Sequence, residues 1–261
     1  AVNEIYEHTH DTAFVREMYP KLLKYHKWWY AKRDHDKNHI CEFGSVDGTL
    51  VAAAWESGMD NAIRFDGTKM LQNGPDAWST DQESVDLNAY LSLEYTLLKK
   101  FAALLDEPFL LPDYRSMVAD YFFDKKDGFF YDRRMNATRD FVREAGCEGY
   151  IPFWANIATK EQFAKARKLL DNKKKFSTYI PFPTIAADNP KYDPKGYWRG
   201  PIWLDQTYYG IKGYRNYGEG KKADAYTDQV FRNIEGLTEG APIYENYDTH
   251  TGKPMQASHF S

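Results

Sequence analysis

Two acidic motifs and one aromatic motif contain the residues of this chain that are best suited to chemistry. The first, WESGMDN, covers residues 55–61, the second, YENYD, covers residues 244–248, and GYWRGPIW covers residues 196–203 between them. Carboxyl groups beside Trp and Gly are poor core residues, because charged side chains are rarely fully buried. A pair of carboxyl groups can cleave a glycosidic bond, one acting as an acid and the other as a base. These residue types therefore predict a sugar-cleaving site.

Taken together and in this order, the three motifs resemble those of glycoside hydrolase family 63, which contains inverting α-glucosidases and other α-glycosidases. The likeness extends from about residue 11 to the end of the chain. It implies that Asp60 is the general acid and Glu245 the general base. In an inverting enzyme the two carboxyl groups lie roughly 6.5–9.5 Å apart, which leaves room for a water molecule. Without the resemblance, Asp60 would equally suit a helix cap and Glu245 a solvated loop.

The general acid needs a raised pKa, which burial or a neighbouring carboxylate can supply. Glu56 lies four residues before Asp60 and would be that neighbour if the stretch is helical. Indole faces pack on the C–H side of a sugar ring, and an Arg side chain offers a rigid fork of donors to hydroxyl groups. Core packing is the alternative for each Trp, and Asp205 is expected to line the site or to hold Arg199. The predicted sugar contacts are Trp55, Glu56, Trp154, Trp198, Arg199, Trp203 and Asp205.

A third acidic segment, residues 34–40, resembles the start of a calcium loop, because D-x-D-x-N and a following carbonyl supply the oxygen ligands that Ca2+ prefers. His39 stands where an EF-hand has Gly, and Ser45 where it has Glu, so the segment is not an EF-hand. The family resemblance implies that a distant Glu in a QES segment completes the site, as Glu83 would here. The predicted ligands of a structural Ca2+ are Asp34, Asp36, Asn38, the Ile40 carbonyl and Glu83. The alternative is an acidic turn without metal.

The composition narrows the classes of partner. Among 261 residues the net charge is −4 and the sequence pI about 6.0, with no basic stripe, which disfavours nucleic acid. The sequence has no long uncharged apolar run, which excludes a membrane-spanning helix. The 20 Tyr, 16 Phe and 7 Trp suit either a large core or carbohydrate-binding faces. Two cysteines, Cys41 and Cys147, are too few for a disulfide scaffold. The oligomeric state stays open.

Helices dominate the predicted elements, since apolar residues recur at helical spacing. A hairpin arm or strand is predicted near residues 128–132, and loops are predicted at 67–80, at 176–196 and in the Pro- and Gly-bearing end after residue 242. The predicted helices span residues 12–32, 83–105, 113–123, 160–170, 203–217 and 221–237, with shorter helical stretches before residue 11 and from Pro152.

The family resemblance implies an all-α (α/α)6 barrel, a toroid of helical hairpins with its site at the loop end. The chain has about eight helical segments, so residues 1–261 are expected to form one catalytic domain that is an incomplete segment of the barrel, truncated at both ends. The expected function is inverting hydrolysis of α-glycosidic bonds in glucose-containing di- or oligosaccharides. A trehalase or a mannosyl- or glucosylglycerate hydrolase would use the same motifs, and a non-catalytic sugar-binding fragment would also carry them. The resemblance favours a periplasmic or secreted location.

Overall fold

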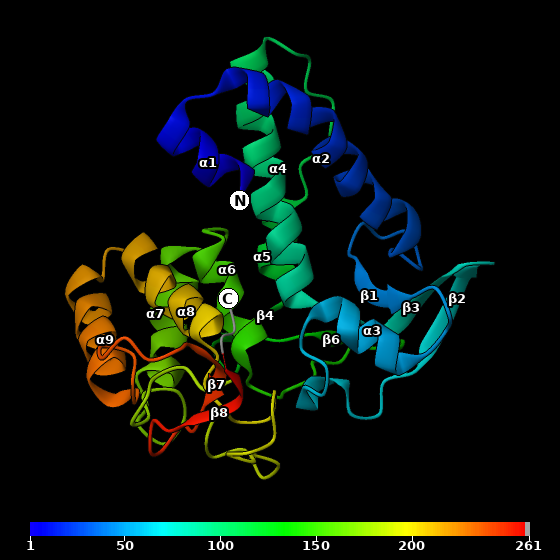
Figure 1. Ribbon diagram of the computed structural model, residues 1–261. Coiled ribbons are helices and arrows are strands. Elements are labelled where there is room, and N and C mark those ends of the chain that lie inside the picture. Colours follow the sequence, from blue (N-terminus) through cyan, green and yellow to red (C-terminus); the bar gives the residue numbers. More distant parts are fainter. Residues whose placement is uncertain (259–261) are drawn as a thin grey trace.

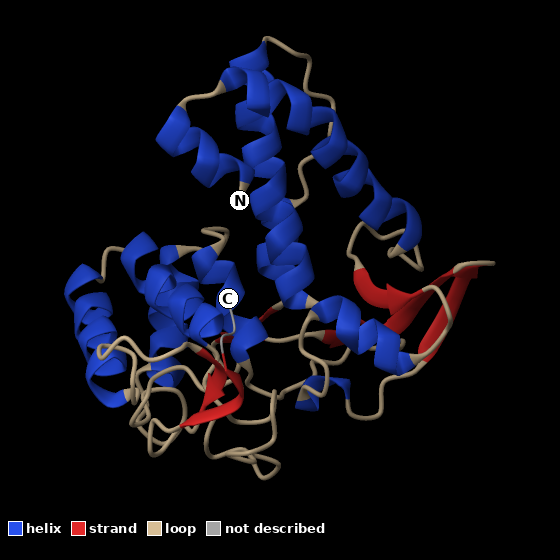
Figure 2. Ribbon diagram, viewed as in Figure 1, coloured by secondary structure: helices blue, strands red, loops and turns tan. Residues whose placement is uncertain are grey.

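The computed structural model describes residues 1–258, which form helices joined by long loops and several small sheets (Figures 1 and 2). The expectation of an all-α chain is therefore wrong, although helices predominate. Within the described residues, no helix is both long and apolar enough to cross a membrane. The α-helices are α1 (Val2–Thr9), α2 (Thr12–Lys32), α3 (Leu50–Ser57), α4 (Val85–Leu105), α5 (Arg115–Tyr121), α6 (Ile151–Trp154), α7 (Lys160–Leu170), α8 (Leu204–Asn216) and α9 (Gly220–Asn233).

The longer predicted helices are confirmed, and their starts follow local capping. Asp11 caps α2, because its carboxylate accepts a hydrogen bond from the backbone N–H of Phe14 at 3.0 Å. Helix α7 begins at a capping box in which Thr159 and Gln162 each accept a backbone N–H from the other. Signals of this kind depend on residues a few positions apart, which is why the sequence alone can place these helix starts.

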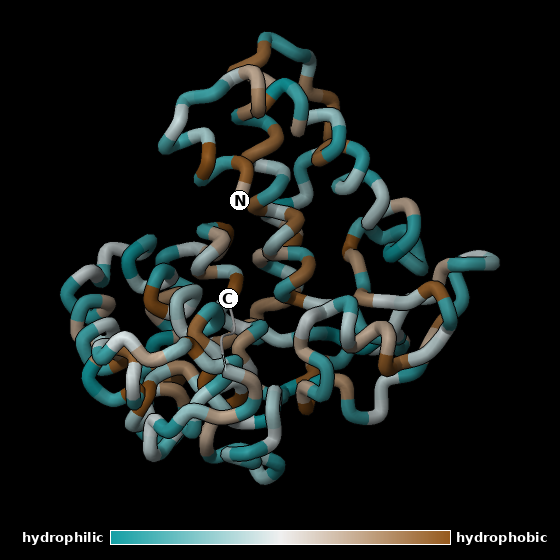
Figure 3. The backbone as a smooth tube through the Cα atoms, in the orientation of Figure 1, coloured by the Kyte–Doolittle hydropathy of each residue, from teal (hydrophilic) through white to brown (hydrophobic). Residues whose placement is uncertain are grey.

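Helix α4 stands between the other parts of the molecule (Figure 1). Its C-terminal half packs against α2 in a small core that contains Val15, Tyr19, Leu98 and Phe101. Its N-terminal half contributes Val85, Leu87, Ala89 and Leu91 to the main core. Brown apolar segments accordingly run along α4 in Figure 3. The helix thereby ties the N-terminal helices to the region that carries the motifs.

An antiparallel sheet lies beside α3, with strand order β1 (Glu42–Ser45), β3 (Ala77–Glu83), β2 (Met70–Gly74), and β6 (Arg133–Arg134) pairs with the end of β3. The predicted loop at 67–80 is wrong, because β2 and β3 form a hairpin there. Their residues are mostly polar and flank Gly74, so no apolar alternation marks them. Ser79 and Thr80 are fully buried nonetheless, because strands pair on both sides of β3.

Two smaller hairpins complete the sheets. The first joins β4 (Phe123–Asp124) to β5 (Phe129–Phe130), which confirms the predicted arm near residue 128. The second joins β7 (Tyr244–Tyr247) to β8 (Pro254–Ser258), where an irregular segment was expected. Residues 176–196 contain no helix or strand, as predicted. Helices α8 and α9 pack as a hairpin of the kind that builds a toroid, but residues 1–258 do not form a closed ring of six such pairs.

Candidate active site

Asp60 lies in a turn between α3 and a short 3-10 helix, Ile63–Phe65. Helix α3 starts at Thr49, whose hydroxyl accepts the N–H of Ala52, and ends at Gly58. Gly58 has a φ of 74°, a left-handed conformation that glycine adopts without steric cost. The chain therefore reverses just before Asp60, while Met59 beside it is buried.

The WESGMDN and GYWRGPIW motifs are joined through Asn61. Its side-chain amide donates to the carbonyl of Gly196 at 3.0 Å, and its oxygen accepts the N–H of Trp198 at 3.0 Å. The two motifs are 135 residues apart in sequence at this contact. Asn61 thus sets the position of the aromatic motif relative to Asp60.

Arg199 strengthens the same junction, which differs from its predicted contact with sugar. Its guanidinium pairs with both carboxylate oxygens of Asp66 at 3.0 and 3.1 Å, and it also donates to the Asn61 carbonyl at 3.2 Å. Of the two roles expected for Asp205, holding Arg199 is therefore excluded, because Asp66 is the partner; the other role, lining the site, is described below. Lys191 adds a second positive charge to Asp66 at 2.9 Å, and these two cations lower the pKa of Asp66.

Strand β7 places the ENYD motif beside the end of the GYWRGPIW motif. Ile202 and Tyr247 exchange two backbone hydrogen bonds of 2.9 Å each, which fix β7 to the end of GYWRGPIW. Glu245 lies where the pairing of β7 with β8 shifts register between Tyr244 and Asn246. Such bulges redirect side chains and recur beside active sites. Glu245 remains partly accessible, whereas Asn246 and Tyr247 are buried.

The carboxylates of Asp60 and Glu245 are close enough to influence each other. Burial raises the pKa of Asp60, and the negative charge of Glu245 raises it further. The sequence had assigned this second role to Glu56, and that assignment is wrong. Glu56 instead pairs with Arg33 through two hydrogen bonds of 2.7 and 2.8 Å and accepts the N–H of Gly44. These contacts occupy the Glu56 carboxylate. Glu56 therefore fixes the C-terminal end of α3 to Arg33 and to strand β1, and it does not face a sugar.

A cleft of about 300 Å3 is lined by Ser57, Gly58 and Met59, the three residues before Asp60, and by residues of the aromatic motif and α8; Asp60 and Glu245 are not among its lining residues. Trp198 and Trp203 stack on each other at 4.0 Å with an angle of 15° between the rings, and both line the cleft while being largely buried. Asp205 also lines it. Its side chain reaches solvent, but the surrounding walls withhold water and raise its pKa. The full lining is Ser57, Gly58, Met59, Tyr90, Trp198, Trp203, Asp205, Gln206 and Tyr209.

Of the remaining predicted sugar contacts, Trp154 lies against the wall of this cleft, and Trp55 does not line it. Trp154 packs against Tyr90 and Tyr209, two residues of the cleft wall, and lines a neighbouring cavity that also includes Tyr90. Trp55 is 63% exposed on the outer side of α3 and lines none of the cavities described here. Trp154 can therefore extend the cleft, whereas Trp55 does not take part in it.

Arg64 is the centre of a buried ionic cluster next to the turn that carries Asp60. It is fully buried and pairs with Asp86 at 2.7 Å and with Asp132 at 3.2 Å. Asp132 in turn accepts the N–H of Val85 at 2.7 Å, so it caps the first turn of α4 from a distant part of the chain. The Arg64 guanidinium also contacts the Met59 sulfur at 3.5 Å, which connects this ionic cluster to the turn that carries Asp60.

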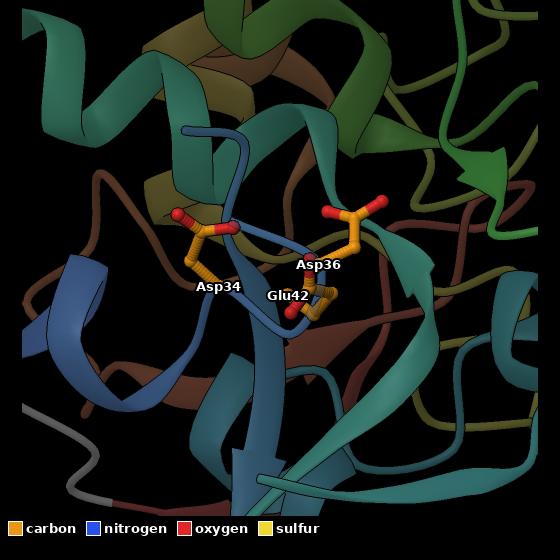
Figure 4. A group of neighbouring side chains, drawn as sticks. All are labelled: Asp34, Asp36 and Glu42. Carbon is orange, nitrogen blue, oxygen red and sulfur yellow. The ribbon is translucent and has the colours of Figure 1, made fainter. Parts of the chain in front are cut away.

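The predicted calcium loop brings together most of its expected ligands. The side-chain amide of Asn38 donates to Glu83 at 2.6 Å, so Glu83 points toward the loop from the end of β3. Single carboxylate oxygens of Asp34, Asp36 and a further residue, Glu42, lie within 4.8 Å of one another (Figure 4). His39 has a φ of 70°, the left-handed conformation that Gly provides at this position of an EF-hand. Its imidazole stacks on Tyr114 at 4.5 Å.

These residues fit a hard cation in charge and in donor type. Glu42 is fully buried, and among the described residues its Oε1 atom has no hydrogen-bond partner. Burial raises the pKa values of Glu42 and Asp34, which shows the cost of keeping these carboxylates charged without a cation. Arg139 donates to both Asp36 and Glu83 and supplies part of the positive charge.

Several residues with a clear place in the site were quoted in the motifs but given no role from sequence. Asn61 is the last residue of WESGMDN, and Tyr197 precedes Trp198; the Tyr197 hydroxyl donates to Oε1 of Glu245 at 2.5 Å. Their membership in the motifs was the available signal. Tyr90 and Asp66 carry no such signal, because their partners are distant in sequence. Glu42 had a local signal, since it occupies the ninth position of the calcium-loop spacing that starts at Asp34, a position that contributes a ligand in an EF-hand.

Comparisons with known proteins find glycoside hydrolases. The model of the mannosylglycerate hydrolase MGH1-like glycoside hydrolase domain matches residues 1–261. Mannosylglycerate hydrolase MGH1 of Selaginella moellendorffii is 25% identical over an alignment of 305 positions, which covers 95% of this chain and 59% of that protein. The mannosyl-oligosaccharide glucosidase of Saccharomyces cerevisiae is 25% identical over 96% of this chain and 34% of its own length.

A solved structure shows the same fold. The GH63 mannosylglycerate hydrolase from Thermus thermophilus, in complex with glucose, superimposes with a TM-score of 0.79 at 21% identity, over 99% of this chain and 70% of that one. The chain spans about three fifths of the length of the first curated relative. The match over its whole length shows that the chain belongs to the mannosylglycerate hydrolase MGH1-like glycoside hydrolase family, which confirms the resemblance to glycoside hydrolase family 63.

Proposed function

We propose that this chain carries the catalytic residues of an inverting α-glycoside hydrolase. The observation that supports this most is that three motifs, separated by long stretches of sequence, meet so that Asp60 and Glu245 influence each other electrostatically beside a cleft lined by stacked indoles. Membership of the family supports the same reaction class.

In the proposed reaction, Asp60 gives its proton to the oxygen of the leaving group as the bond from C1 to that oxygen breaks. Glu245 takes a proton from a water molecule whose oxygen bonds to C1 from the opposite face. The configuration at C1 therefore inverts. The raised pKa of Asp60 suits the acid, because a larger fraction of it keeps a proton as the pH approaches neutrality.

For the substrate, we propose an α-linked mannosyl or glucosyl unit on a small acidic or sugar aglycone. The names of the similar proteins, mannosylglycerate hydrolase and mannosyl-oligosaccharide glucosidase, support this range and favour a glycosylglycerate ahead of an oligosaccharide. The cleft of about 300 Å3 is of the size expected for a small ligand.

The test is hydrolysis of mannosylglycerate, glucosylglycerate, trehalose and an α-glucosyl oligosaccharide by this chain, with the released anomer followed by proton NMR. Inversion releases the β-anomer first, whereas release of the α-anomer would indicate a retaining enzyme. Asp60→Asn and Glu245→Gln are each expected to lower kcat by about 10^2- to 10^4-fold, the usual contribution of general acid or base catalysis. Asp120→Asn and Glu239→Gln, two exposed carboxylates elsewhere, serve as matched controls and should leave kcat unchanged.

A sugar-binding fragment without activity is the alternative, and calorimetry separates it from an enzyme. If the chain only binds sugar, the wild type will bind these ligands with measurable affinity and release no sugar. Asp60→Asn will then change only the affinity.

We also propose that the 34–42 loop holds a structural Ca2+ ion. The supporting observations are the carboxylate oxygens of Asp34, Asp36 and Glu42, which lie within 4.8 Å of one another, and the buried Oε1 of Glu42, which has no partner among the described residues. In this proposal Glu42 joins the predicted ligands. The ion would neutralise the carboxylates and stabilise the loop, and it takes no part in the chemistry at Asp60 and Glu245.

A further inference from the structure

Tyr197 has an unusual backbone for a residue with a bulky side chain. Its φ is 64°, in the left-handed region that non-glycine residues seldom occupy outside functional sites. Two contacts hold this conformation: the Trp203 indole N–H donates to the Tyr197 carbonyl at 3.1 Å, and the N–H of Trp198 donates to Asn61 at 3.0 Å. The Tyr197 ring meets the Trp203 ring edge-on at 5.1 Å. The surrounding motif therefore fixes the direction of the phenol.

The phenol points at the proposed base. Its hydroxyl donates to Oε1 of Glu245 at 2.5 Å. The charge of Glu245 acts on two titratable groups, Tyr197 and Asp60. Within the described part of the chain, Oε2 of Glu245 has no hydrogen-bond donor. One oxygen is thus held and the other is left for a water molecule.

We propose that Tyr197 is a positioning residue that orients Glu245 as the base of the hydrolytic reaction. This inference rests on the proposed function. Tyr197 keeps its own proton throughout, because it donates the hydrogen bond to Oε1. Oε2 accepts the proton of the attacking water, the water oxygen bonds to C1, and the leaving oxygen takes the proton of Asp60. Without the phenol, the carboxylate on the bulged segment of β7 would lose this donor and be free to rotate.

The test is Tyr197→Phe, which removes the hydroxyl and keeps the ring that packs on Trp203. A hydrogen bond to a charged group corresponds to a factor of about 10 to 100, so kcat should fall by about that amount. KM should change little. Tyr208→Phe, at an exposed tyrosine of α8 outside the cleft, is the matched control and should change neither value.

A second readout does not depend on turnover. Burial and then the hydrogen bond and charge of Glu245 raise the pKa of Tyr197, so the 13C signal of the Tyr197 phenol, followed against pH without substrate, should titrate at lower pH in Glu245→Gln than in the wild type. An unmoved titration would overturn the inference, even if kcat fell through a general loss of packing. If the wild-type chain releases no sugar but the phenol titration moves, the hydrogen bond is upheld and the proposed function fails on its own.

Discussion

Two effects raise the pKa of Asp60, and they can be separated by experiment. Burial raises its pKa first, and the charge of Glu245 adds to the rise. Because the proposed general acid would act in its protonated form, activity should be lost as the pH rises through this raised pKa. The same shift means that ionised Asp60 destabilises the folded chain at higher pH, so Asp60→Asn should not lower Tm at neutral pH.

We expect Glu245→Gln to lower the pKa of Asp60, because the neutral amide removes the repulsion between the two carboxylates, while burial keeps the pKa above its ordinary value. The measurement is the pH titration of the Asp60 carboxyl carbon by 13C NMR. Glu239→Gln, at an exposed site, should leave the titration where it is in the wild type. A pKa that does not respond to Glu245→Gln would mean that the two carboxylates are too far apart to cooperate.

At the scale of the element, the end of α3 decides where Asp60 points. Gly58 stops the helix with a φ of 74°, and a Cβ placed on it would have no atom within 4 Å. A substitution there would therefore introduce backbone strain without a steric clash. This makes Gly58 a direct probe of the turn that leads to Asp60.

Gly58→Ala should lower the free energy of unfolding by about 1 kcal/mol, the cost of a left-handed conformation for a residue with a Cβ. It should also lower kcat, since relief of the strain reorients the next residues. Gly220→Ala is the matched control: its added Cβ is also unobstructed, but its φ is not positive and it lies at the start of α9. Chemical denaturation and steady-state assays of both variants make the comparison. Equal stability and activity in the two variants would show that the α3 turn does not position Asp60.

At the scale of the whole molecule, the acidic loop joins segments that are far apart in the chain. Asp34 follows α2, Glu42 begins β1, Glu83 ends β3, and Arg139 reaches in from the loop after β6. An ion that binds only the folded chain stabilises it by mass action, by about 2.7 kcal/mol when its concentration is 100 times its Kd. The proposed Ca2+ would therefore hold the end of α2 to the sheet formed by β1, β3 and β2.

We expect added Ca2+ to raise Tm and a chelator to lower it. Arg139→Ala removes the positive charge shared by Asp36 and Glu83, so the difference between calcium-loaded and chelated protein should grow in this variant. Calorimetric scans with Ca2+, with Mg2+ and with chelator give the comparison, and Arg215→Ala, at an exposed ion pair on α8, is the control. If Tm is the same in all three conditions for both the wild type and Arg139→Ala, the loop is an acidic turn held by Arg139 alone.

The sequence by itself determined the elements whose causes are local. The start of α2 at Asp11 and the whole of α7 follow from capping residues and helical periodicity within the same segment. The three motifs also pointed to the family, and the resemblance to it, rather than the spacing of the residues, suggested the two acids proposed for catalysis. The proline-bearing stretch at 176–196 could be read as a loop for the same local reason.

Only the tertiary structure decided which side chain meets which. Glu56 pairs with Arg33 and not with Asp60, Arg199 takes Asp66 as its partner, and Glu42 joins the acidic loop. The hairpin of β2 and β3 was missed because its polar strands gain their stability from pairing with β1 and β6 rather than from an apolar pattern of their own. Such pairings depend on the distances and burial that the folded chain creates between distant segments, and no local pattern of residues specifies those distances.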